Sequence, residues 1–303
     1  MKTLSVLLVA IALAIPVQAV RETKRPPLIG IDHVAFRTSD PMAARSFYGG
    51  LLGLGGAVAG VVPGQKAGDT RPADGGSSWL EFTINTRQRL LIQPGLAAGT
   101  DERLDHIALA TSDLDAMATY LRDRGVAFDG PATGTACRSR GLRISDPDSH
   151  TIELVQESAD VSFPAESASA LSARLLHAGV TVRDEAAASG FYHDVLAMDE
   201  IWRGGADPAK TSWVNMRVPE GTDYLEYMLR DSPSSRRQLG VDHHICLLVP
   251  DIQRAWERVR QRTATARREA LEPPRIGRNL RWQLNLYDPD GTRVELMEPF
   301  TAK

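Results

Sequence analysis

Alternating apolar and polar positions mark four short strands, one at the start of each of four similar stretches of chain. In 105–111, Ile107 and Leu109 share one face and His106 lies on the other, the pattern of a strand with one buried face. Each strand carries a histidine that is followed seven residues later by an aspartate: His33 and Asp40, His106 and Asp113, His177 and Asp184, His244 and Asp251. The chain has only 7 histidines, so four such matches about 70 residues apart indicate an internal repeat.

The first repeat shows which elements each unit should contain. Its opening strand, 31–36, is followed by Asp40 and Pro41, a helix N-cap and a proline suited to the first turn. Apolar residues at helical spacing continue to Leu51, and Gly53 ends the helix. The later elements expected are strands at 78–84 and 89–93 and a Gly/Pro/Asp-rich loop at 62–77.

The four repeats are of two kinds. The first and third share an aromatic pair followed by two apolar residues: Phe47, Tyr48, Leu52, Leu54 and Phe191, Tyr192, Leu196, Met198. The second and fourth share Asp-Pro-Asp and a later glutamate: Asp146, Pro147, Asp148, Glu153 and Asp288, Pro289, Asp290, Glu295. One unit is too small to bury its own sheet, so an odd and an even unit should pair into a domain that is then duplicated. We therefore predict an α+β fold of four modules in two domains.

The expected domain boundaries follow from the repeats and from composition. They are a signal peptide at 1–19, an N-terminal domain at 28–157, a linker at 158–173 and a C-terminal domain at 174–300. The linker is rich in Ala and Ser, which is typical of an open connection or of a short helix that joins two domains.

The first 19 residues have the pattern of a secretory signal. Lys2 supplies a positive charge, the segment from Leu4 to Ile15 is apolar, and 17–19 offers a small-residue cleavage site. The apolar segment is shorter than the ~20 residues that span a bilayer. We expect an exported protein, periplasmic or secreted, with no membrane association after the signal is removed.

Composition narrows the choice of partners. The chain has 43% hydrophobic and 24% charged residues and a net charge of −3, so it lacks the basic character of a nucleic-acid-binding protein. Cys137 and Cys246 are expected to be small buried thiols, because export permits a disulfide without requiring one. A small molecule is the expected partner of this chain.

The histidines and glutamates occupy the strand face opposite the helix. In the last strand, Val294 and Leu296 face one way and Glu295 faces the other. A single histidine in a strand is commonly a core residue with satisfied ring nitrogens. Four at equivalent positions, with carboxylates at matching positions, would be costly to bury without a cation. The pattern therefore favours a metal site inside each domain.

The motifs that carry these residues resemble the vicinal oxygen chelate superfamily, which includes glyoxalase I, extradiol dioxygenases and bleomycin-resistance proteins. The shared motifs are Asp-His-Val-Ala from Asp32, Phe-Tyr-x-x-x-Leu-x-Leu from Phe47, and Asp-Pro-Asp-Gly-Thr-Arg-Val-Glu-Leu from Asp288. The resemblance implies βαβββ modules, each pair forming an open barrel around one metal. It also implies that the ligands come from the first and last strands of both modules in a pair.

In the C-terminal pair, the resemblance implies the two-His, two-Glu set of glyoxalase I: His177, Glu226, His244 and Glu295. This donor set suits an octahedral divalent ion such as Ni, Co, Fe, Mn or Zn. Such an ion holds two neighbouring substrate oxygens, and a carboxylate beside it moves a proton. The resemblance makes Glu295 or Glu226 the catalytic base of an isomerase or lyase acting on a substrate with vicinal oxygens.

The N-terminal pair matches only three of the four positions, with His33, His106 and Glu153. The fourth position aligns with Leu91, and Gln93 lies one step further along the same face. Gln93 is then a neutral fourth ligand, or the other three form a two-His, one-carboxylate site like that of extradiol dioxygenases. A site that has lost its metal and serves only as a scaffold is the third alternative.

Three further residues are candidates for substrate binding. Arg278 and Arg281 precede the closing motif and could receive an anionic substrate, and Trp282 could stack on a planar one. The simpler interpretations are a solvated charged surface for the arginines and core packing for the tryptophan.

Two other functions remain open. A ring-cleaving dioxygenase in this superfamily carries a tyrosine three residues before the Asp-Pro of the closing motif. This chain has Arg143 and Asn285 there, which disfavours ring cleavage in both domains. A metal-free binding protein of the bleomycin-resistance type would stack its ligand on tryptophans such as Trp79, Trp213 and Trp282. A fused pair already supplies a partner domain, so a monomer is expected somewhat more than a homodimer.

Overall fold

A computed structural model describes residues 23–59, 79–97, 102–133, 140–156, 167–266 and 271–302. The signal segment at 1–19, the loop at 62–77, Cys137 and most of the linker lie outside these residues. Within them, no helix is long and apolar enough to cross a membrane.

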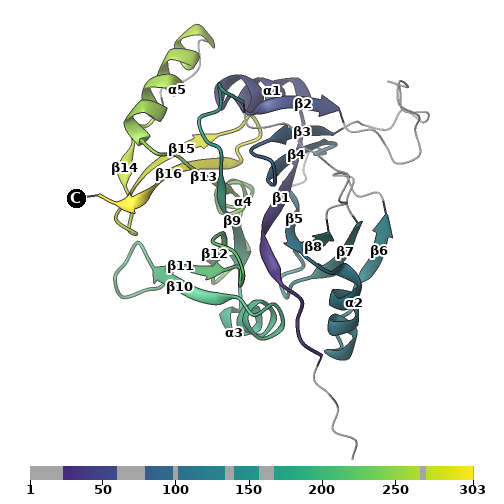
Figure 1. Cartoon of the computed structure of the whole chain (residues 1–303). Helices are drawn as coiled ribbons and strands as arrows, with labels where there is room; N and C mark the ends of the chain where they lie inside the picture. Colours follow the sequence, from purple (N-terminus) through teal and green to yellow (C-terminus); the bar gives the residue numbers. More distant parts are fainter. Residues whose placement is uncertain are drawn as a thin grey trace, which may run out of the picture.

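The chain forms two eight-stranded sheets of identical topology, which confirms an α+β fold of two duplicated domains (Figure 1). The order is β2-β3-β4-β1-β5-β8-β7-β6 in the first sheet and β10-β11-β12-β9-β13-β16-β15-β14 in the second.

The first sheet contains β1 (Leu28–Thr38), β2 (Gly55–Ala59), β3 (Leu80–Thr83), β4 (Arg89–Pro94), β5 (Leu104–Thr111), β6 (Asp129–Thr133), β7 (Arg140–Ser145) and β8 (Thr151–Gln156). The second contains β9 (Leu175–Val182), β10 (Asp199–Gly204), β11 (Trp213–Arg217), β12 (Tyr224–Leu229), β13 (Ile245–Leu248), β14 (Arg275–Ile276), β15 (Arg281–Tyr287) and β16 (Arg293–Thr301). The helices are α1 (Pro41–Arg45), α2 (Leu114–Asp123), α3 (Glu185–Ser189), α4 (Arg236–Asp242), α5 (Ile252–Ala266) and the π-helical turns η1 (Ser46–Leu51) and η2 (Gly190–Val195).

The aspartates of the repeated His/Asp pattern start the helices. Asp40, Asp113 and Asp184 are N-caps whose carboxylates accept hydrogen bonds from backbone N–H groups of the first turn. Asp251 accepts in the same way from the N–H of Arg254 at 3.0 Å. The fixed spacing therefore measures the distance from the histidine in each opening strand to the beginning of the next helix.

The two modules of a domain join at the centre of its sheet. β1 pairs antiparallel with β5, and each pairs in parallel with the last strand of its own module, β4 or β8. The second sheet repeats this arrangement around β9 and β13. Each sheet thus brings the first and last strands of both modules side by side, where the sequence places the histidines and glutamates.

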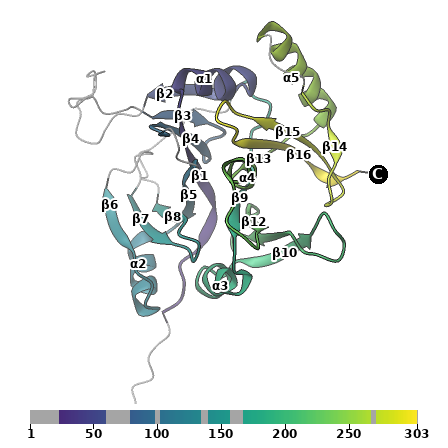
Figure 2. The same ribbon diagram turned by 180° about the vertical axis from the view of Figure 1, so that it is seen from behind.

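The two domains share one hydrophobic core. A single cluster of buried side chains contains residues of all four modules, among them Phe36, Leu121, Val180 and Leu296. The sheets are bent, and their concave faces point to opposite sides of the molecule, with β1 and β9 near the middle (Figures 1 and 2).

Tyrosines of the odd modules bind the Asp-Pro-Asp loops of the opposite domain. The hydroxyl of Tyr48 donates to Asp288 Oδ2 at 3.0 Å, and the hydroxyl of Tyr192 donates to Asp146 Oδ2 at 2.8 Å. All four residues are buried. The Phe-Tyr and Asp-Pro-Asp motifs therefore hold the two domains together.

The described end of the linker, 167–173, forms turns rather than a helix. Its Leu171 N–H donates to the carbonyl of Leu52 in the first domain at 2.9 Å. In the second domain, Cys246 is a buried free thiol, and burial raises its pKa well above the ordinary value.

Candidate metal sites

The four residues expected to bind a metal in the C-terminal domain lie close together. Nε2 of His177 is 3.1 Å from Nε2 of His244 and 3.4 Å from Oε2 of Glu295. Oε2 of Glu226 is 3.3 Å from Nε2 of His244 and 3.9 Å from Nε2 of His177. The two imidazoles and two carboxylates therefore converge on the concave face of the second sheet.

These separations suit ligands of one cation. Bonds of about 2.0–2.2 Å to N and O donors place neighbouring ligands of an octahedral ion about 3 Å apart and opposite ligands about 4 Å apart. The histidines and Glu295 offer atoms that all lie within 4.8 Å of one another. The donor set fits a borderline divalent metal ion.

The N-terminal domain brings together three donors in the same manner. Nε2 of His33 is 2.8 Å from Nε2 of His106. Oε2 of Glu153 is 3.6 Å from Nε2 of His33 and 3.1 Å from Nε2 of His106. The two histidine rings meet edge to face, with centroids 5.0 Å apart, against 5.1 Å for His177 and His244. Both domains therefore position two histidines and the glutamate of the closing strand alike.

Strand register identifies the residue at the fourth position of the N-terminal site. Glu226 lies opposite Gly179 in the second sheet, and Leu91 lies opposite the equivalent Ala35 in the first. Leu91 is fully buried and packs against Ala35 and Trp79. Gln93 is two residues further along β4, about 7 Å away, and none of the described hydrogen bonds joins it to the three donors.

Carboxylates hold both N-terminal histidines from behind. Nδ1 of His33 is 2.5 Å from Asp32 Oδ1, and Nδ1 of His106 is 2.7 Å from Asp105 Oδ2. Each aspartate also binds an arginine, since Arg89 contacts Asp32 at 2.6 Å and Arg37 contacts Asp105 at 2.5 Å. A carboxylate behind a histidine fixes the ring and makes its other nitrogen a better metal ligand.

This arrangement directs two lone pairs at one point. If each Nδ1–H donates to its aspartate, both Nε2 lone pairs face each other across 2.8 Å beside a carboxylate. Such a cluster needs protons or a cation between its members. Burial acts to raise the pKa of Glu153, but hydrogen bonds and charge from His106 and His33 hold it well below its ordinary value, so the glutamate is an anionic donor.

The C-terminal histidines have different support. Leu176 stands in the position of Asp32, and Nδ1 of His177 has no hydrogen-bond partner among the described residues. The ring of His177 packs instead on Tyr224, with centroids 4.6 Å apart. Nδ1 of His244 lies 2.8 Å from the carbonyl oxygen of Asp242, which leaves its Nε2 directed at the site.

An arginine also enters the C-terminal site. Nη2 of Arg293 lies 2.9 Å from both ring nitrogens of His244 and 4.0 Å from Oε2 of Glu226. Burial and the Arg293 charge lower the pKa of His244, which favours the neutral imidazole that a metal requires. Burial acts to raise the pKa of Glu295, but His177 and Arg293 lower it to about 2, so the carboxylate is ionised.

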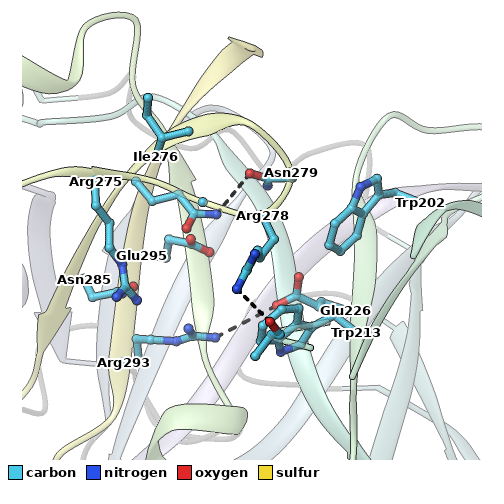
Figure 3. A pocket seen from close by; sticks show the side chains of 13 residues that line it. Trp202, Trp213, Glu226, Arg275, Ile276, Arg278, Asn279, Asn285, Arg293 and Glu295 are labelled. Carbon is cyan, nitrogen blue, oxygen red and sulfur yellow. Dashed lines mark hydrogen bonds and ion pairs between the residues drawn. The ribbon is translucent and has the colours of Figure 1, made fainter. Parts of the chain in front are cut away.

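Two of the C-terminal donors, Glu226 and Glu295, line a pocket of about 360 Å³ (Figure 3). Arg278 and Trp213 line it as well. Trp282, expected as a substrate contact, instead packs against the hydrophobic core, because it alternates with the pocket-lining Gln283 along β15.

Several neighbours of the two sites were not expected from the sequence. They are Asp32, Asp105 and Arg89 in the N-terminal site and Trp202 in the C-terminal site. An aspartate directly before the histidine is a signal for the first two, because it stands before both N-terminal ligands and directly before neither C-terminal one. Arg281, the other predicted arginine, is the first residue of β15 and is not among the residues that line the pocket.

Two bent sheets, each with histidines and a glutamate at the junction of paired modules, define a duplicated protein with metal-binding-capable sites. The sequence matches the Glyoxalase/Bleomycin resistance protein/Dioxygenase superfamily over residues 30–154 and 174–296. The chain belongs to this family, whose two matched stretches coincide with the two sheets. No curated protein matches the chain.

Several solved structures with the same fold are dioxygenases. The 2,3-dioxygenase LapB from Pseudomonas sp. KL28 is 15% identical, with a TM-score of 0.66 over 91% of this chain and 93% of that one. Homoprotocatechuate 2,3-dioxygenase from Arthrobacter globiformis is 17% identical, with a TM-score of 0.65 over 90% and 80%. The same enzyme from Brevibacterium fuscum, in complex with 3,4-dihydroxyphenylacetate, is 17% identical, with a TM-score of 0.63 over 91% and 82%. At this identity the likeness concerns the fold.

Proposed function

We propose that the chain is a divalent-metal-dependent enzyme that acts on a small substrate with two neighbouring oxygens. The C-terminal site would catalyse proton transfer, as an isomerase or a lyase. The observation that carries this proposal is the convergence of four donors, two of which, Glu226 and Glu295, line an open pocket. The site in the other domain brings together only three such donors.

The two glutamates differ in a way that assigns their roles. The side chain of Glu295 is only 5% exposed and lies 3.4 Å from His177, whereas that of Glu226 is 14% exposed. Glu295 is therefore suited to remain a fixed ligand. Glu226, between His244 and the pocket, is suited to accept a proton from the substrate carbon and return it to the neighbouring position.

The remaining groups would stabilise negative charge that develops on the substrate oxygens. The metal would polarise the two substrate oxygens as a Lewis acid. Burial acts to raise the pKa of Glu226, but His244 and His177 hold it below its ordinary value, which keeps the carboxylate ionised. Arg293, 4.0 Å from Glu226, can donate to a substrate oxygen on which negative charge develops.

The test combines metal content with turnover. The protein is stripped with a chelator, reconstituted with Ni, Co, Fe, Mn or Zn, and assayed on α-hydroxyketones. We expect Glu226→Gln to keep the metal and to lose about 10²–10⁴-fold in turnover, while His244→Ala loses the ion of this site. A folded Glu226→Gln protein with full turnover contradicts the assignment. Full binding of small molecules after complete chelation would instead support a metal-free binding protein.

A second function, an oxygen-dependent reaction at the N-terminal site, has its own support. His33, His106 and Glu153 form a two-His, one-carboxylate set like that of non-haem iron oxygenases, and the solved relatives are dioxygenases. Arg143 stands 3.8 Å from Glu153, at the position where the ring-cleaving enzymes are expected to carry tyrosine. Oxygen consumption with Fe(II) and a catechol, abolished in His106→Ala and retained in His244→Ala, would favour this function.

The amino-terminal leader would place either activity outside the cytoplasm. A purified mature protein from the exported fraction that begins near Val20 would support this localisation, and a cytoplasmic full-length chain would contradict it.

A further inference from the structure

We propose that the pocket of the C-terminal site takes an aromatic carboxylate. Its ring would lie against Trp202 and Trp213, and its carboxylate would bind Arg275 and Arg278. The metal-facing end of this ligand rests on the proposed function, whereas recognition of the ring and the carboxylate does not.

The two arginines stand on the rim of the pocket. Arg275 is in β14 and Arg278 in the turn that follows, and both are exposed. Nη2 of Arg278 donates to the carbonyl oxygen of Ala206 at 2.6 Å, and so joins this rim to the β10–β11 loop opposite (Figure 3). Neither arginine forms an ion pair with a carboxylate in the described part of the chain, so both guanidinium groups are available to an anion.

The charges around the pocket favour an anionic ligand. Its lining contains three arginines, Arg275, Arg278 and Arg293, against two carboxylates, Glu226 and Glu295. A divalent metal would neutralise both glutamates and leave the three guanidinium groups in excess. Positive charge in a concave surface attracts anions and raises their local concentration.

The opposite wall of the pocket is aromatic. Trp202 of β10 and Trp213 of β11 lie across from the arginine-bearing strands (Figure 3). Gly204 makes room for the first indole, because a Cβ at this position would lie 2.6 Å from Trp202 Cη2. Both rings are partly exposed, so each offers a flat apolar face to a planar ligand.

Size limits the ligand to a small molecule. A volume of about 360 Å³ corresponds to roughly twelve water molecules at ~30 Å³ each. A single ring with a short acidic side chain and two oxygens fills this space. The side-chain Oδ1 of Asn285, buried without a hydrogen-bond partner among the described residues, adds a polar contact beside Glu295.

The test uses two probes that differ in one group, 3,4-dihydroxybenzoate and catechol. Binding is measured by calorimetry on metal-loaded and on chelator-stripped full-length protein. We expect 3,4-dihydroxybenzoate to bind at least about tenfold more tightly than catechol, because a charge-assisted hydrogen bond is worth that much. The same preference is expected without metal, since no metal ligand contributes to it.

Variants separate the two walls of the pocket. Arg275→Gln and Arg278→Gln should each reduce the preference for the carboxylate by about tenfold and leave catechol unchanged. Trp202→Leu should weaken both probes alike. The matched control is Arg254→Gln, an exposed arginine of α5 in the same module, which should change neither.

Equal affinity for the two probes, no binding of either at millimolar concentrations, or arginine variants that behave like the control would overturn the inference. A carboxylate preference in a protein that binds no metal would leave it standing and refute the proposed function instead.

Discussion

The two metal sites share a scaffold and three donors but differ in what lies behind the donors. In the N-terminal site, His33 is held by Asp32, which pairs with the fully buried Arg89. In the C-terminal site the equivalent histidine, His177, has Leu176 beside it and packs on Tyr224. His33 is thus supported by an ion pair, and His177 by apolar and aromatic contacts.

The residues behind the two histidines differ on two neighbouring strands at once. Arg89 lies opposite His33 across the β1–β4 pair, as Tyr224 lies opposite His177 across the β9–β12 pair. A buried guanidinium is tolerated only with a counter-charge, so the carboxylate and the arginine must be present or absent together. Where both are absent, hydrocarbon and an aromatic ring fill the same space.

The largest effect on the free energy of unfolding should come from replacing one member of the Asp32–Arg89 ion pair. Asp32→Leu leaves Arg89 without its Asp32 partner in the core, and we expect a loss of about 3–5 kcal/mol in the free energy of unfolding. The double change Asp32→Leu with Arg89→Tyr copies the C-terminal site. It should cost less than the sum of the two single changes by about 1–3 kcal/mol. Urea unfolding measures this coupling, and strictly additive costs would contradict it.

The fourth donor is the next difference to test. Leu91→Glu places a carboxylate where the C-terminal site has Glu226. Without metal the variant should be less stable than the parent by several kcal/mol, because a second charge is buried near Glu153. Saturating metal should raise its stability by about 3 kcal/mol, the gain expected at a hundredfold excess over the dissociation constant. The parent protein is the control, and an equal metal response in the parent and the variant would count against a fourth ligand.

Arg293 is a charged residue that the C-terminal site has and the N-terminal site lacks. Its equivalent in the first domain is Thr151, since both lie two residues before the closing glutamate. Arg293→Thr removes a positive charge from the vicinity of His244, so metal affinity in this site should rise about tenfold. Competition with a chelator of known affinity measures the change. An N-terminal affinity that shifts equally would show that the effect is not local.

The smallest expected effect concerns the contact between the domains. Burial raises the pKa of Asp288 to about 6, although the Thr292 N–H and the Tyr48 hydroxyl oppose this shift. Since the folded protein holds this proton more tightly than the unfolded chain, the carboxyl group costs stability as the pH rises from about 4 through 6. Tyr48→Phe removes one donor to the carboxylate, so the loss should be about 1–2 kcal/mol at pH 8 and smaller at pH 4. A loss that is independent of pH would mean that the hydroxyl acts through packing alone.

The sequence predicted the duplicated fold and the convergence of the donors because both depend on short-range patterns. Strand alternation placed His106 and Glu295 on the concave face, and the histidine-to-aspartate spacing marked the helix N-caps. The alignment of Leu91 with Glu226 was also predicted, and the strand register agrees with it.

Features that depend on two distant segments could not be predicted in this way. The Tyr48–Asp288 hydrogen bond joins residues of different domains, and Arg89 reaches Asp32 only because β4 pairs with β1. Trp282 was a candidate for stacking on a ligand, with core packing as the simpler interpretation, and it packs against the core. Periodicity defines a face of a strand, whereas the neighbours of that face depend on tertiary pairing.

The opposed direction of the two concave faces has a consequence for how this chain can change over generations. The donors of one domain therefore face away from those of the other, on the far side of the molecule. Each metal site can therefore gain or lose a metal-binding side chain independently, while the shared hydrophobic core continues to support both domains.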